Sequence, residues 1–183
     1  GEDLDKRLHY ERLRGTLPDT PRTDMELEEW KQQTEVFGTA LLDLIEQPIE
    51  QKSFTVVVGQ YRITGSCWLS GSTQLFWRPA DPKGKDIVRL WLYHLLVTLA
   101  SKQSDFPIIN TTKGLYRGKK SKAKKGGDEK AYQLIGFEMQ ENAQDRLEYW
   151  LSVREQGLKS PKLINAGLAI SVFDKRRAGK TLS

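Results

Sequence analysis

The stretch SFTVVVGQYRITGSCWLSGSTQLFWR, residues 53–78, contains the clearest structural pattern in the chain. Its β-branched and aromatic residues come in three short runs, which is typical of strands. Gly59-Gln60 and Ser70-Gly71-Ser72 separate the runs, and such short breaks are typical of tight turns. Three consecutive strands joined in this way predict an antiparallel meander.

The segments on either side of the meander have helical spacing. Apolar residues recur at helical steps over residues 27–44, 87–99 and 143–151, which predicts three helices with one buried stripe each. A shorter helix is expected from Leu4 to Gly15, with Gly15 as its C-cap. Thr23-Asp24-Met25-Glu26 has the pattern of a capping box, so we expect the second helix to begin there.

Two further strands are expected after the helix at residues 87–99. Residues 106–110 and 131–137 have strand composition, and the charged residues between them suggest a hairpin whose loop projects from the body. After the short first helix, the order is therefore helix, three strands, helix, two strands, helix. We expect a single domain over residues 1–183, of the α/β or α+β class, with a mixed sheet flanked by helices.

The composition excludes several classes of protein. Hydrophobic residues make up 38% of the 183 residues, enough to bury a core. No apolar run approaches the ~20 residues that a membrane-spanning helix needs. The single cysteine, Cys67, cannot form an internal disulfide or supply a cysteine-rich zinc site. We therefore expect a cytoplasmic protein with no membrane contact, metal or cofactor. Because the chain begins at Gly1 without Met, we also expect either a processed protein or a fragment of a larger protein.

Positive charge is concentrated in one segment. The formal net charge is +5, and residues 113–125 hold seven cations and no acid, so the rest of the chain carries −2. We expect a basic insertion loop at residues 112–130, which like-charge repulsion would extend, and a basic tail at residues 174–183. The loop either contacts phosphates, which makes binding salt-dependent, or is a solvated surface loop with no ligand. The candidate DNA-binding residues are Lys113, Arg117, Lys119, Lys120, Lys122, Lys124 and Lys125.

Asp81-Pro82-Lys83 is a motif with a catalytic interpretation. An acid, any residue and a lysine after a β-hairpin are similar to the motif of PD-(D/E)XK nucleases, in which carboxylates bind Mg²⁺ and lysine helps activate the attacking water. Chance predicts about two acid-x-Lys pairs in this composition, and four occur. In that fold the ligands project from the middle strands, where this chain has Cys67, Trp68, Trp77 and Arg78. None of these supplies the anionic oxygen that Mg²⁺ requires.

Other chemistry-bearing residues favour structural roles. His94 lies beside the apolar face of its helix, so we expect a hydrogen-bonded structural histidine. Trp68 and Trp77 alternate within strands and are expected in the core, although exposed rings of this kind can stack on bases. Trp30 is expected on the buried stripe of its helix. The sequence has no Gly-rich phosphate loop, which argues against nucleotide hydrolysis.

Five segments, in order along the chain, carry a resemblance to a known family. They are Gly15-Thr16-Leu17-Pro18, Arg62-Ile63-Thr64-Gly65-Ser66, Leu75-Phe76-Trp77-Arg78-Pro79, the helical residues 88–95, and residues 145–163. Through these segments the chain resembles the C-terminal domain of the RecC family, the gamma subunits of the RecBCD complex (exodeoxyribonuclease V).

The resemblance implies a PD-(D/E)XK-like fold that has lost its catalytic acids, and therefore a domain that is not an enzyme. It implies docking to RecB-like and RecD-like subunits, which carry the motors and the nuclease. It also implies a part in guiding or splitting duplex DNA ends into single strands in double-strand-break repair and recombination. The lysine segment looks longer than the matching region of the family, so no DNA role is carried over to it.

Two alternatives remain beside this interpretation. The first is an active metal-dependent nuclease that uses Asp81 and Lys83 together with a second acid. The other is a protein–protein adaptor whose lysine segment binds nothing.

Overall fold

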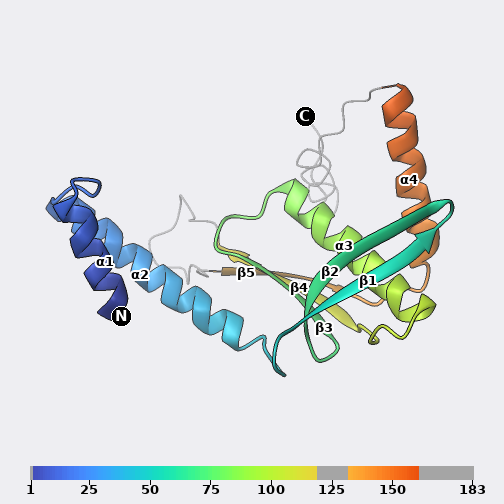
Figure 1. Ribbon diagram of the computed structural model, residues 1–183, viewed down its shortest axis with the longest axis horizontal. Coiled ribbons are helices and arrows are strands. Elements are labelled where there is room, and N and C mark those ends of the chain that lie inside the picture. The colour runs from blue at the N-terminus through green and yellow to red at the C-terminus, as the bar shows by residue number, and fades with distance from the viewer. Residues whose placement is uncertain (1, 119–131, 161–183) are drawn as a thin grey trace, which may run out of the picture.

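A computed structural model describes residues 2–118 and 132–160 (Figure 1). These residues form one five-stranded sheet, in the order β1-β2-β3-β4-β5, and four helices. This confirms the α+β class and the mixed sheet flanked by helices. The elements are α1 (Glu2–Leu13), α2 (Pro21–Leu42), β1 (Glu50–Val58), β2 (Tyr61–Ser70), β3 (Thr73–Arg78), α3 (Gly84–Gln103), β4 (Thr111–Arg117), β5 (Tyr132–Glu138) and α4 (Ala143–Lys159).

The first three strands form the predicted antiparallel meander. Gly59 turns the chain between β1 and β2 with φ of 57°, and Gly71 turns it between β2 and β3 with φ of 58°. Both angles lie in the left-handed region that glycine adopts without a steric penalty. Strand β3 then pairs in parallel with β4, and β4 pairs antiparallel with β5. The sheet is mixed because α3 forms the crossover between the parallel strands β3 and β4.

The main core lies between the sheet and α3, with α4 alongside (Figure 1). Leu95 and Val97 of α3 are fully buried, as are Val56 and Val58 of β1. Leu147 of α4 joins the same cluster. Alternate residues of a strand point to one face, so the β1 pattern itself selects the face that meets α3.

Helices α1 and α2, here called the helical arm, extend away from the sheet (Figure 1). Gly15 ends α1 with φ of 72°, which confirms the predicted C-cap. Near the other end of the arm, Phe37 and Ala40 of α2 pack on Leu115 of β4. Trp30 is 52% exposed, so the prediction of a fully buried stripe is wrong for this part of α2. The periodicity is helical, but the helix extends beyond the sheet that could cover it.

The start of α2 differs from the predicted capping box. Thr20 is the N-cap, and its Oγ1 accepts the N–H of Thr23 at 3.3 Å. Pro21 fits in the first turn because that position needs no N–H donor. Glu26 pairs instead with Arg22, whose Nε donates to the carboxylate at 2.9 Å. The capping prediction at Thr23 is therefore wrong, because Pro21 begins this helix rather than preceding it.

The predicted strand at residues 106–110 is also wrong. That segment is irregular, although Ile109 is buried, and the strand is β4, residues 111–117. Residues 112–117 therefore belong to a strand and not to a basic loop. The expected hairpin pairing of β4 with β5 is confirmed, from Thr111 to Arg117. The described residues do not include Lys119, Lys120, Lys122, Lys124, Lys125 or the tail at 174–183.

Candidate functional site

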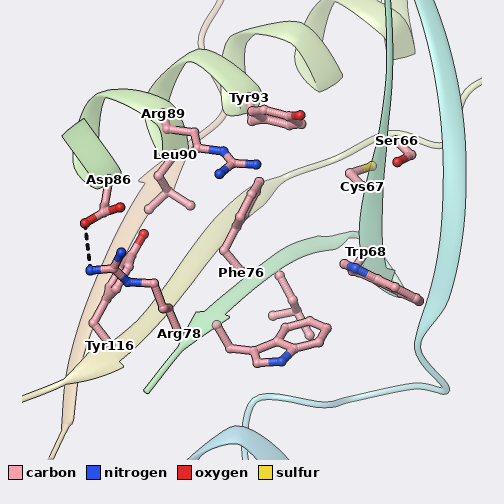
Figure 2. Close-up of a pocket in the computed structure, with 12 residues that line it drawn as sticks. Ser66, Cys67, Trp68, Phe76, Arg78, Asp86, Arg89, Leu90, Tyr93 and Tyr116 are labelled. Atoms are coloured by element: carbon pink, nitrogen blue, oxygen red, sulfur yellow. Dashed lines mark ion pairs between the residues drawn. The ribbon is translucent and has the colours of Figure 1, made fainter. Parts of the chain in front are cut away.

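A pocket opens where β2 and β3 separate. These strands pair only from Trp68 opposite Leu75 to Ser70 opposite Thr73. Beyond that point β2 pairs with β1 alone, and β3 pairs with β4 as far as Arg78. The cavity of about 470 Å³ in this gap, here called the fork pocket, lies below the first turns of α3 (Figure 2). Its lining is Ser66, Cys67, Trp68, Leu75, Phe76, Trp77, Arg78, Asp86, Arg89, Leu90, Tyr93 and Tyr116.

The one described carboxylate in the fork pocket is already neutralised. Nη2 of Arg78 lies 3.1 Å from Oδ2 of Asp86, as the dashed line in Figure 2 shows. The same carboxylate oxygen accepts the backbone N–H of Lys83 at 2.8 Å, which caps the first turn of α3. Asp86 is thus held by two structural donors, which leaves little of the charge that a cation would need.

Arginine makes the fork pocket positive. In the described chain no carboxylate forms an ion pair with Arg89, whose guanidinium carbon lies 5.7 Å from the ring centre of Tyr93. The Nε of Arg78 is buried and has no hydrogen-bond partner among the described residues. Two guanidinium groups therefore face one carboxylate, and the pocket attracts anions.

The two tryptophans of the fork pocket are exposed, which contradicts the prediction that they pack in the core. Trp68 is 41% exposed and Trp77 is 36% exposed. Their ring centres lie 6.0 Å apart, with a tilt of 50° between the planes. On β2, Trp68 alternates with Cys67 and Leu69, both buried on the α3 side, so it points to the other face of the sheet. The alternation of residues along β2 showed that the two faces of the sheet differ, but it did not show that the face carrying Trp68 is uncovered.

The remaining aromatic residues form the inner wall. Phe76 and Tyr93 meet edge to face, with ring centres 5.3 Å apart. Burial, followed by the nearby Asp86 carboxylate, raises the pKa of the Tyr116 phenol. Burial also raises the pKa of the Cys67 thiol to about 11. Near neutral pH both groups keep their protons, so neither is an activated nucleophile.

The residues of the acid-x-lysine motif lie outside the fork pocket. Asp81 follows β3, and its Oδ1 accepts a hydrogen bond from Nε of Arg117 at 3.0 Å, with both side chains about half exposed. Lys83 is the residue before α3, where its backbone binds Asp86. Among the described residues, no three His, Cys, Asp or Glu side chains are placed to hold a metal ion.

Two of the seven candidate DNA-binding residues lie in the described part of the chain, both on β4. Lys113 lies 3.6 Å from a carboxylate oxygen of Glu46, and Arg117 pairs with Asp81. Neither of them lines the fork pocket. The structure thus brings Arg117 to Asp81 across 36 residues of sequence. Arg78 donates to the carbonyl oxygen of the same Asp81 at 2.9 Å.

His94 has the structural role predicted for it. It is fully buried, with Nδ1 2.9 Å from the Thr112 hydroxyl and Nε2 2.7 Å from the carbonyl oxygen of Glu138. A carbonyl only accepts, so Nε2–H is the donor to Glu138. Burial lowers the pKa of His94, which keeps the ring neutral.

The fold and the pocket define an α+β domain with a mixed sheet and a cationic, aromatic cleft. The model of the RecC C-terminal domain family matches residues 1–177, nearly the whole chain. The chain therefore belongs to the family of C-terminal domains of RecC, the gamma subunit of exodeoxyribonuclease V (RecBCD). No curated protein matches it. Within the described residues, no helix is both long and apolar enough to cross a membrane.

Proposed function

We propose that this chain is a non-catalytic, nuclease-like domain of a cytoplasmic RecC subunit. It docks RecB-like and RecD-like partner subunits and helps guide or split duplex DNA, while the partners carry out catalysis. The observation that carries this proposal is the content of the fork pocket, where aromatic rings and two arginines surround a single carboxylate bound to Arg78.

The electrostatics of the pocket argue against magnesium chemistry by this domain. Mg²⁺ takes oxygen ligands in an octahedral arrangement and is usually bound through one or two carboxylates and several waters. Asp86 is bound to Arg78 and to the N–H of Lys83, and Arg89 adds a further positive charge. Asp81, the acid of the acid-x-lysine motif, is neutralised by Arg117 outside the pocket.

The helical arm supports the docking part of the proposal. Six large apolar side chains of α1 and α2 are exposed, and apolar area of this kind can be covered by another protein. We propose that a partner subunit of the complex covers this surface. The six side chains are Tyr10, Leu13, Met25, Trp30, Val36 and Leu42.

The decisive experiment is a nuclease assay with linear double-stranded and single-stranded DNA in Mg²⁺ and in Mn²⁺. We expect the purified chain to cleave neither substrate above the level of a buffer control, and Asp81→Ala to behave like the wild type. Metal-dependent cleavage that Asp81→Ala abolishes would instead establish the active nuclease and remove the scaffold proposal. Lys83→Ala serves as the second variant, because lysine is the other catalytic member of that motif.

A further inference from the structure

The mouth of the fork pocket presents two large apolar rings to solvent. Trp68 and Trp77 come from strands that no longer pair with each other, and their ring centres are 6.0 Å apart. This separation lies within the ~4.5–7 Å of contacting aromatic pairs, so a third ring stacks on the outer surface of the pair rather than between its members. Both side chains are more than a third exposed, so their faces are accessible without unfolding.

On the α3 side of the sheet, which the fork pocket reaches through the gap between β2 and β3, the pocket offers donors for an anion. Arg89 has no carboxylate partner in the described chain, and the buried Nε of Arg78 lacks an acceptor there. A buried N–H without an acceptor is unfavourable, and an oxygen from a ligand would remove that penalty. Guanidinium groups bind phosphate with several parallel hydrogen bonds, which makes phosphate the anion that fits best.

The combination of an accessible aromatic surface and a guanidinium pair selects a ligand class. A metal ion needs the opposite charge, and an acidic peptide uses the cations but leaves the tryptophans without a partner. A nucleotide uses both features of the pocket, because its base can stack on the tryptophans and its phosphate can bind the arginines. In a duplex the bases are stacked and paired, so only a single strand offers a free base face. A cavity of about 470 Å³ also falls within the roughly 300–1,000 Å³ of small-ligand sites.

We propose that the fork pocket binds one unstacked nucleotide of single-stranded DNA. The base stacks on the Trp68–Trp77 pair, and Arg89, with Arg78, contacts the adjacent phosphate. This inference deepens the proposed function and rests on it, because it assigns a separated strand of the guided DNA to a defined site on this domain.

The test compares two oligonucleotides of equal length and charge, one of thymidines and one of abasic residues. Each is titrated against the 183-residue chain at low salt by fluorescence anisotropy. Trp77→Ala is expected to weaken thymidine binding about tenfold, because a base–aromatic stack is lost, and to leave abasic binding unchanged. Trp77→Phe retains a ring and is expected to recover much of the affinity. Arg89→Ala is expected to weaken the binding of both oligonucleotides.

Matched controls separate stacking from general effects of mutation. Tyr149→Ala removes a ring that is 65% exposed on α4, and Arg154→Ala removes an exposed cation from the same helix. Neither is expected to change binding. Circular dichroism checks that each variant is folded, and Trp68→Ala provides a second stacking variant should Trp77→Ala not fold.

Other outcomes would overturn the inference. If Trp77→Ala and Trp68→Ala bind thymidine and abasic strands like the wild type, the pocket is not a base site, although a chain without nuclease activity still fits the proposed function. If an acidic peptide competes for the pocket and loses affinity in the tryptophan variants as strongly as DNA does, the ligand class is wrong. Metal-dependent DNA cleavage would reject the proposed function itself.

Discussion

At the scale of single residues, Asp86 shows how a carboxylate in a cleft can be structural. Its Oδ2 lies 2.8 Å from the N–H of Lys83 and 3.1 Å from a guanidinium nitrogen of Arg78. Its side chain is 14% exposed and that of Arg78 is 40% exposed, so water screens the ion pair mainly from the arginine side. A partly buried acid whose charge is balanced in this way is better suited to fixing the start of α3 than to holding a metal.

His94 gives a prediction for the pH dependence of stability. Burial lowers its pKa in the folded state below the ordinary value of 6.5. Between those two pKa values the unfolded chain binds a proton that the folded chain does not, so stability falls as the pH decreases through 6.5. We expect the free energy of unfolding in urea to decrease by up to about 1.4 kcal/mol per pH unit in that window from this group.

The variant His94→Gln isolates this effect, because glutamine does not titrate. It is expected to be less stable than the wild type at pH 7.5 but to lose less stability on going to pH 5.5. His9→Gln, on the surface of α1, is the control and is expected to keep the wild-type slope. An unchanged slope in His94→Gln would show that other groups cause the pH dependence.

Gly114 gives a prediction about packing between β4 and α3. A Cβ atom at this position would lie 2.7 Å from Cδ2 of Leu90 and 2.8 Å from Cε2 of Tyr116, both of which are buried. We expect Gly114→Ala to lower the free energy of unfolding by roughly 1–3 kcal/mol, the usual effect of overpacking. Gly136→Ala on β5 is the matched control, because its Cβ meets its nearest neighbour at an ordinary 3.6 Å. Equal stability of the two variants would contradict the prediction.

At the scale of elements, the helical arm and the α3 layer differ in how they are held. No side chain of residues 3–13 is buried, and α1 is tied to α2 by ion pairs such as Lys31 with Asp5, at 2.8 Å, and Arg12 with Asp24. Surface pairs of this kind contribute little and weaken with salt. Helix α3, in contrast, has seven buried residues and lies at the centre of the core.

Hydrogen exchange followed by mass spectrometry tests this difference between the elements. We expect the amides of α1 to exchange through local opening at a small free energy, and those of α3 to exchange only near the free energy of global unfolding. Salt at 1 M is expected to speed exchange in α1 further and to leave α3 unchanged. Equal protection of both helices in the isolated chain would mean that the arm belongs to the same cooperative unit as the core.

At the scale of the whole molecule, charge is distributed unevenly. The lysine segment, residues 113–125, supplies seven of the cations, while the rest of the chain carries a formal net charge of −2. In the described part, Lys113 and Arg117 are already paired with acids. Any long-range attraction of DNA by this segment therefore falls mainly to the five lysines at 119, 120, 122, 124 and 125.

Replacing these five lysines with glutamine tests their part in DNA binding. We expect weaker binding and a shallower dependence on salt, with a loss of roughly 0.7 in the log–log slope for each lysine that contacts a phosphate of single-stranded DNA. A control variant with the same change in net charge replaces five cations elsewhere: Lys31, Lys52, Lys102, Arg154 and Lys159. If both variants lose affinity equally, only net charge matters and the segment is not a DNA contact.

The sequence alone determined those features that depend on local patterns. Alternation predicts the strands of the meander, and helical spacing predicts α3 and the structural role of His94. The backbone freedom of glycine explains the turns at Gly59 and Gly71. The absence of carboxylates at the middle of residues 67–78 is likewise a property of the sequence.

Tertiary structure alone decided which of these patterned surfaces is covered. Alternation gives a strand two faces, but only the packed molecule shows that the side carrying Trp68 and Trp77 is open and that α2 runs past the sheet at Trp30. The fork pocket exists because β2 and β3 stop pairing at Trp68 and Leu75, and beyond that point β2 pairs with β1 and β3 with β4. Asp81 meets Arg117 because β4 returns beside β3. Such contacts join residues far apart in the chain, so their geometry depends on how whole elements pack and not on local sequence.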